Sequence, residues 1–206
     1  MFIDPAVSLR PPPLTHSPFK SLVVPRPIAW VSSLSRDGVV NLAPYSFFNA
    51  ISEDPCCVMF AAGGAHIEGG PKDSLKNVEE SGEFVVNLVT HELREPMNTT
   101  SAAVGRDVSE AALVGLALAP SVKVAPPRVA ASPASLECRW LQTIPVPHPR
   151  ARDNRVMVIG EVVGIYIRDD LIVDGRVDIR RLGPVARLGY NDYTTVTEFF
   201  TMVRPG

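Results

Sequence analysis

The sequence has no apolar run that approaches the roughly 20 residues a membrane-spanning helix requires. Its proline-rich beginning, which carries Asp4 and Arg10, also lacks the apolar core of a secretory signal. Cysteine is scarce: Cys56, Cys57 and Cys138 are odd in number and lack the spacing of a metal site, and the neighbours Cys56 and Cys57 could form only a strained disulfide. These absences predict a cytoplasmic protein with buried, free thiols of no redox role and no contact with a membrane.

An excess of charge of one sign is also missing. The formal net charge is −2, the pI is about 6.1, and no basic run is longer than Arg180-Arg181. Such a balance argues against a nucleic-acid binder, because binding to phosphate backbones needs a concentrated basic surface. The expected partners are small molecules or a second copy of the chain.

Motifs for nucleotide binding and for side-chain catalysis are missing too. The chain contains no Gly-x-Gly-x-x-Gly fingerprint, no P-loop and no Gly-x-Ser-x-Gly elbow. Its histidines, His16, His66, His91 and His148, are far apart and have no zinc-ligand spacing with the cysteines. No pair of carboxylates stands out. We therefore expect that catalysis, if there is any, depends on a bound cofactor.

What the sequence does contain is many short apolar segments separated by turns. Its 20 prolines and 14 glycines are scattered along the chain. Residues 28–34 and 39–43 predict a hairpin around 35–38, because an Asp-Gly turn accommodates a positive φ. The continuous apolar run 56–62 predicts a strand buried on both faces. Since the strands do not alternate regularly with helices, we predict a mainly β protein with closed antiparallel strands and a few peripheral helices.

Helices are predicted in two places. One begins at Lys72, with Asp73 or Ser74 as the capping side chain, and ends at Gly82 in the position typical of a C-terminal cap. The other is the region 91–119, which becomes rich in alanine and leucine toward its end.

The second half of the chain predicts further strands and a loop. Residues 122–124 are a candidate short strand, and 145–154 a loop rich in proline and arginine. Residues 155–167 form the longest strand-like stretch, in which Gly160 and Gly164 are the expected bend points.

Two segments carry a resemblance to a known family. Residues 25–32 (Pro-Arg-Pro-Ile-Ala-Trp-Val-Ser) lead into 41–50 (Asn-Leu-Ala-Pro-Tyr-Ser-Phe-Phe-Asn-Ala), and 72–77 (Lys-Asp-Ser-Leu-Lys-Asn) follow. Weaker matches continue in the same order through 82–89, 121–138, 159–164 and 187–189. In these motifs the chain resembles the flavin reductase-like, flavoredoxin-type FMN-binding split-barrel family. The resemblance extends from about Leu22 to about Thr195.

This resemblance implies a fold, an assembly and a cofactor. The fold is a split β-barrel with antiparallel, Greek-key-like strands over residues 19–206, preceded by a proline-rich arm of residues 1–18. The assembly is a homodimer, with FMN rather than FAD near the subunit interface.

The resemblance also implies the residues that bind FMN. Lys72 would offer a cation to the phosphate beside the free N–H groups of a helix start. Ser32 and Ser46 are short donors for phosphate or ribityl oxygens, and Asn49 can both donate to and accept from the ring edge. The complete expected set is Trp30, Ser32, Pro44, Tyr45, Ser46, Phe48, Asn49, Ala50, Lys72, Asp73 and Ser74.

Taken singly, these residues have plainer interpretations. Trp30 and Phe48 are of types that usually fill a core, Ser74 is a common helix cap, and Lys72 is typical of a solvated surface. Only their joint occurrence favours FMN. The chain also departs from the family at Tyr190, which stands where the family commonly has a second glycine. We expect this change to affect the substrate more than the cofactor.

The activity implied is that of an NAD(P)H-dependent flavin reductase. Transiently bound NADH or NADPH would give hydride to flavin N5, and a second flavin, a monooxygenase or another acceptor would receive the electrons. No side-chain acid or base is required. Two alternatives stay open: a flavoredoxin-like FMN-binding electron carrier without nicotinamide activity, and a barrel that has lost its cofactor and serves as an interaction module.

Overall fold

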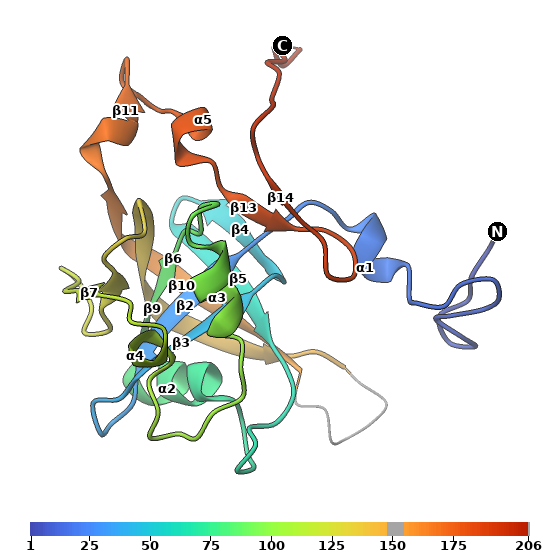
Figure 1. Ribbon diagram of the computed structural model, residues 1–206, viewed down its shortest axis with the longest axis horizontal. Helices are drawn as coiled ribbons and strands as arrows, with labels where there is room; N and C mark the ends of the chain where they lie inside the picture. The colour runs from blue at the N-terminus through green and yellow to red at the C-terminus, as the bar shows by residue number, and fades with distance from the viewer. Residues whose placement is uncertain (148–154, 206) are drawn as a thin grey trace.

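Seven antiparallel strands form the main sheet of the protein, whose computed structural model describes residues 1–147 and 155–205 (Figure 1). The strands are hydrogen-bonded in the order β3-β2-β6-β9-β10-β5-β4. Their bounds are Ala29–Leu34 (β2), Val40–Tyr45 (β3), Phe48–Glu53 (β4), Cys56–Ala62 (β5), Glu83–Asn87 (β6), Ala134–Pro145 (β9) and Val156–Ile167 (β10). The prediction of a mainly β, antiparallel fold is confirmed.

Strands β2 and β3 form the predicted hairpin. Ala29 lies opposite Tyr45, and Leu34 lies opposite Val40. Gly38 sits in the turn with a φ of 82°, a left-handed conformation that glycine adopts without steric cost. Because β2 pairs with β3 on one side and β6 on the other, its residues are almost all buried.

The sheet curls because its two edge strands are neighbours in sequence. Strands β3 and β4 stand at opposite ends of the strand order, yet only Ser46 and Phe47 separate them along the chain. At this link the N–H of Ala61 in β5 donates to the carbonyl of Phe47 at 2.8 Å. This bond extends the β4–β5 ladder, and the short link itself keeps the two edges close, so the sheet curls into a barrel instead of an open layer.

Strand β10 bends where the two glycines predicted it. Its register with β9 shifts between Ile159 and Gly160, and again between Val162 and Gly164. Gly160 also marks a close approach, since a Cβ there would come within 2.6 Å of ring atom Cε1 of Phe84.

Alternate residues of β2 face two different apolar clusters. Ala29 and Val31 belong to a cluster that contains Phe60 and Phe84 and is covered by α2 (Asp73–Ser81). Trp30 belongs to the other cluster, which also contains residues of two short helices. These helices are α3 (Arg94–Thr99) and α4 (Glu110–Leu113). The period of two along β2 thus divides the core into two halves.

A smaller sheet packs beside the barrel. It consists of β1 (Arg26–Pro27), β13 (Val185–Arg187) and β14 (Tyr193–Thr195), with α1 (Phe19–Leu22) next to it. Residues 1–18 contain no helix or strand, and Figure 1 shows this segment and the C-terminal tail extending away from the barrel.

The remaining elements are short and peripheral. They are β7 (Leu118–Ala119), β8 (Arg128–Val129), the 3₁₀ helix η1 (Asp169–Leu171), β11 (Ile172–Val173), β12 (Arg176–Val177) and α5 (Ile179–Leu182). Within the described ranges, no helix combines the length and the apolar character needed to span a membrane. Of the predicted loop 145–154, residues 148–154 lie outside the part that the structure describes.

Three local predictions are wrong. The region 91–119 is helical only at α3 and α4, and it ends in β7. The segment 122–124 is not a strand, because the carboxylate of Glu137 accepts its N–H groups, for example that of Lys123 at 2.6 Å. Cys56 is exposed at the start of β5, whereas the other two cysteines, Cys57 and Cys138, are buried as predicted.

Candidate functional site

Helix α2 begins where the glycine-rich loop 63–71 ends. Lys72 is its N-cap residue, and no side chain caps the first turn, so the predicted cap by Asp73 or Ser74 is wrong. With no capping side chain among the described residues, the first N–H groups of the helix can face an anion. Gly82 ends the helix with a φ of 75°, as predicted.

A small cavity of about 150 Å³ lies between β3, the start of α2 and residues 100–104. Asn41 of β3 donates to the hydroxyl of Ser74 at 2.7 Å and so joins the strand to the helix start. The structure brings together five residues of the expected set around this cavity: Pro44, Tyr45, Lys72, Asp73 and Ser74.

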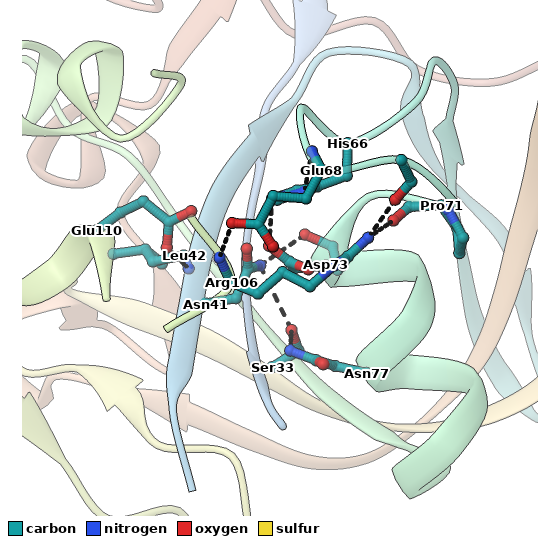
Figure 2. A network of polar contacts seen from close by, with 12 residues as sticks. Ser33, Asn41, Leu42, His66, Glu68, Pro71, Asp73, Asn77, Arg106 and Glu110 are labelled. Carbon is teal, nitrogen blue, oxygen red and sulfur yellow. Dashed lines mark hydrogen bonds and ion pairs between the residues drawn. The ribbon is translucent and has the colours of Figure 1, made fainter. Parts of the chain in front are cut away.

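Asp73 is engaged by its protein neighbours (Figure 2). The guanidinium of Arg106 donates to the Asp73 carboxylate, which also lies 3.2 Å from Nε2 of His66. The same guanidinium donates to the carbonyls of Gly69 at 2.7 Å and Pro71 at 3.0 Å. The network offsets the charge of Asp73 and ties the glycine-rich loop to the helix start. Asp73 thus helps to position the glycine-rich loop relative to the helix start.

Two titratable side chains on the cavity wall are buried. Glu110 accepts a hydrogen bond from the N–H of Leu42 at 2.9 Å, but burial is the stronger influence and raises the pKa of its carboxyl. Burial likewise raises the pKa of Tyr45 to about 12, although its hydrogen bond with Ser74 opposes the shift. Tyr45 therefore remains a neutral hydroxyl at physiological pH.

A larger cleft of about 810 Å³ adjoins the small cavity at Ser101, which lines both. Arg94 and Asn98 of α3 stand on one wall, and Arg187 and Tyr193 of the small sheet stand on another. Its volume falls in the range of roughly 300–1,000 Å³ that is typical of small-molecule sites.

Two residues of the expected set lie in the core. Trp30 and Ser32 have no exposed surface. The indole of Trp30 donates to the hydroxyl of Thr100 at 2.9 Å, and the hydroxyl of Ser32 donates to the carbonyl of Pro127 at 2.6 Å. Thr100 lines the small cavity, so Trp30 supports the site from behind.

The other four expected residues line neither cavity. Ser46 in the β3–β4 link and Phe48 at the start of β4 are partly buried, whereas Asn49 and Ala50 are exposed on β4. Since β4 is an edge strand, these residues are accessible from outside the barrel.

Several polar residues of the site were missed from the sequence. They are Asn41, His66, Ser101, Arg106 and Glu110. Asn41 interrupts the apolar run of β3, and Glu110 precedes Ala-Ala-Leu, so a polar residue inside an apolar segment was the available signal. No local pattern connects Arg106 with Asp73.

Comparison with known proteins identifies the family. The model described as "Flavin reductase like domain" matches residues 21–182. The chain belongs to the flavin reductase-like family. Its barrel is accordingly the split barrel of these proteins, as the sequence predicted.

Three similar proteins illustrate the range of this flavin reductase-like family. An uncharacterized protein of Halalkalibacterium halodurans, BH2278, is 38% identical over 183 residues, which are 89% of this chain and 87% of that protein. Nitrilotriacetate monooxygenase component B from Bacillus cereus has a TM-score of 0.88 and 28% identity, with 98% of each chain covered. The 2-nitrobenzoate 2-nitroreductase NbaA of Pseudomonas fluorescens has a TM-score of 0.79 and 35% identity over 91% of this chain and 88% of that one.

Proposed function

We propose that this protein is an FMN-dependent oxidoreductase that takes hydride from NADH or NADPH and passes the electrons to a second acceptor. The observation that carries the proposal is the small cavity, where Lys72 and the uncapped start of α2 meet the polar wall of β3. When bound, FMN supplies the redox chemistry, since its ring accepts hydride and releases electrons singly or in pairs.

The donors of this cavity fit a phosphate monoester. Lys72 is exposed and makes no ion pair with any described residue. The free N–H groups of α2 add partial positive charge, and Arg106 already offsets the Asp73 carboxylate at the helix start. A volume of about 150 Å³ is sufficient for a phosphate group.

The expected ring contacts lie next to this cavity along the chain. We assign the ring to Pro44, Tyr45 and the following residues Ser46, Phe48, Asn49 and Ala50. The neutral Tyr45 hydroxyl and the amide of Asn49 provide donors and acceptors for a polar ring edge. Trp30 and Ser32 act by packing behind the site.

The protein's part in catalysis is to orient and to stabilise charge. A ring held on the exposed β4 edge keeps one face open for a nicotinamide, and fixed cations nearby stabilise the negative charge that develops on reduction. No side chain has to donate or remove a proton.

We also propose that the protein works as a cytoplasmic homodimer, with residues 1–18 as an arm and 19–206 as the flavin-binding domain. Large apolar side chains are exposed on α1, on β4 and on the C-terminal tail, for example Leu22, Ile51 and Phe200. Exposed apolar side chains in such numbers mark interaction surfaces. Sedimentation at about twice the 22.3 kDa chain mass would support the dimer, and sedimentation as a monomer would contradict it.

Two acceptors are supported by the comparisons. Similarity to a monooxygenase component B favours a partner monooxygenase. The 35% identity to a 2-nitrobenzoate 2-nitroreductase favours reduction of a nitroaromatic acid as a second candidate function.

Anaerobic mixing with reduced nicotinamides tests the proposed activity. The FMN-loaded protein is mixed with NADH or NADPH, and the flavin absorbance is followed. Bleaching at about 1 s⁻¹ or faster, typical of enzymatic turnover, is the expected result. Bound flavin that dithionite reduces and neither nucleotide reduces would instead establish an electron carrier. Failure to retain any flavin would favour the interaction module.

A further inference from the structure

Arg26, Arg187 and Tyr193 form one row across the small sheet. Arg26 of β1 lies directly opposite Arg187 of β13, and Arg187 lies directly opposite Tyr193 of β14. Residues paired in this way carry their side chains on the same face of a sheet. Two positive charges therefore stand side by side, which destabilises a sheet unless an anion lies near them.

No carboxylate of the described residues forms an ion pair with either arginine. Arg26 is only 6% exposed, it donates to carbonyls such as those of Val23 and Leu188, and its Nε makes no hydrogen bond. Burial, followed by the charge of Arg187, lowers the pKa of Arg26. Within the described part of the chain, the positive charge of the pair thus has no carboxylate as counter-ion.

Arg187 directs this charge into the larger cleft. Its guanidinium donates to the Tyr193 hydroxyl at 2.7 Å and lies 4.7 Å from the centroid of the Tyr193 ring, and both residues line the cleft. Met97 and Val185, which are largely buried in the core, form apolar parts of the cleft wall. Arg94 on the facing wall differs, because its Nε lies 3.5 Å from the carboxylate of Glu95.

A guanidinium that has no carboxylate partner among the described residues, beside an aromatic ring and an apolar wall, suits one class of ligand. A carboxylate pairs with the guanidinium through charge-assisted hydrogen bonds, and a flat ring packs on tyrosine and methionine. The neutral hydrogen-bonding groups of the cleft cannot replace that anion.

We infer that the cleft binds an aromatic carboxylate, with the carboxylate on Arg187 and the ring against Tyr193. Because Ser101 lines both cavities, the ligand lies next to the cavity that we assign to the FMN phosphate. Its role as a second substrate rests on the proposed function, whereas its binding does not.

Calorimetric titration with benzoate and with benzamide, its neutral analogue, tests the inference. The full-length protein is titrated both before and after saturation with FMN. We expect benzoate to bind about tenfold or more tightly than benzamide, since only benzoate pairs with the guanidinium. This comparison needs no variant. Equal affinities, or no benzoate binding in either state of the protein, would overturn the inference.

Substitutions then locate the site. Arg187→Gln should weaken benzoate binding about tenfold while changing benzamide binding less than about twofold, and Arg187→Lys should restore part of the affinity. Arg94→Gln should weaken benzoate binding less than Arg187→Gln does, because Glu95 already offsets Arg94. A larger effect of Arg94→Gln would contradict the assignment. Benzoate binding by a protein that retains no FMN would support this inference while refuting the proposed function.

Discussion

Arg106 and Asp73, separated by 33 positions in the sequence, are joined by a hydrogen bond from the guanidinium to the carboxylate. Through Gly69 and Pro71 the same guanidinium holds the glycine-rich loop. Arg106, which lines neither cavity, therefore holds in place the loop that leads to the start of α2. At this helix start we place the phosphate of the cofactor.

Replacing Arg106 should weaken both the fold and cofactor binding. Arg106→Gln leaves the Asp73 carboxylate, which is 13% exposed, without its main partner, and we expect a loss of about 2 kcal/mol in the free energy of unfolding. FMN affinity should fall about tenfold, since a less ordered loop and a repelling carboxylate both oppose the phosphate. Urea unfolding and FMN fluorescence titration measure the two effects.

Arg36→Gln is the matched control for that variant. Arg36 pairs with Glu80 on the surface, where its side chain is 76% exposed, and such pairs contribute about 0–1 kcal/mol. If both variants lowered stability and FMN affinity equally, the network around Asp73 would not have the role assigned to it.

Lys72 should distinguish FMN from riboflavin. Lys72→Gln removes the cation facing the phosphate, and we expect FMN to bind about 10- to 100-fold more weakly. Riboflavin has no phosphate, so its affinity should stay the same. Lys76→Gln, one turn further along α2, is the control and should leave FMN binding within about twofold. Equal losses for the two flavins would place the phosphate elsewhere.

Gly160 should tolerate no side chain. In Gly160→Ala the new methyl group would meet the ring of Phe84, which is completely buried, and the backbone carbonyl of Arg139 lies 3.2 Å away. Overpacking of this kind costs about 1–3 kcal/mol in the free energy of unfolding. Phe84→Leu combined with Gly160→Ala should cost less than the sum of the two single changes. Strict additivity would show that the two residues do not compete for space.

Glu110 should make stability depend on pH. Because burial raises the pKa of its carboxyl in the folded protein, the unfolded chain releases this proton first as pH rises. The native state therefore loses stability between the ordinary pKa of a glutamate and the raised one. Glu110→Gln keeps an acceptor for the N–H of Leu42 but cannot ionise. It should gain stability relative to the wild type as the pH rises above the ordinary pKa of a glutamate, as measured by urea unfolding. If the free energy of unfolding of Glu110→Gln and of the wild type changed with pH in the same way, the result would argue against a buried carboxyl.

Local patterns in the sequence predicted much of the barrel. The Asp-Gly turn predicted the β2–β3 hairpin, the glycines at 160 and 164 predicted the bends of β10, and Gly82 predicted the end of α2. In each case the residues that give the signal lie within a few positions of the feature that they predict. The conformational preference of the local backbone is therefore sufficient for the prediction.

Features that depend on distant contacts were not predicted. Lys72 begins α2 without a side-chain cap because Asp73 bonds Arg106 and Ser74 bonds Asn41 instead. Trp30 was an expected flavin contact, but it lies inside the barrel, where it donates to Thr100. No spacing in a single sequence reveals such partners, because these residues come into contact only when the sheet curls into a barrel.

The most direct test of the central claim is the visible spectrum of the protein after incubation with FMN and removal of free flavin by desalting. The account predicts a yellow protein with the absorbance of oxidised flavin at about one FMN per chain, and a largely colourless Lys72→Gln variant. A colourless wild-type protein, or equal retention of FMN by both, would contradict it.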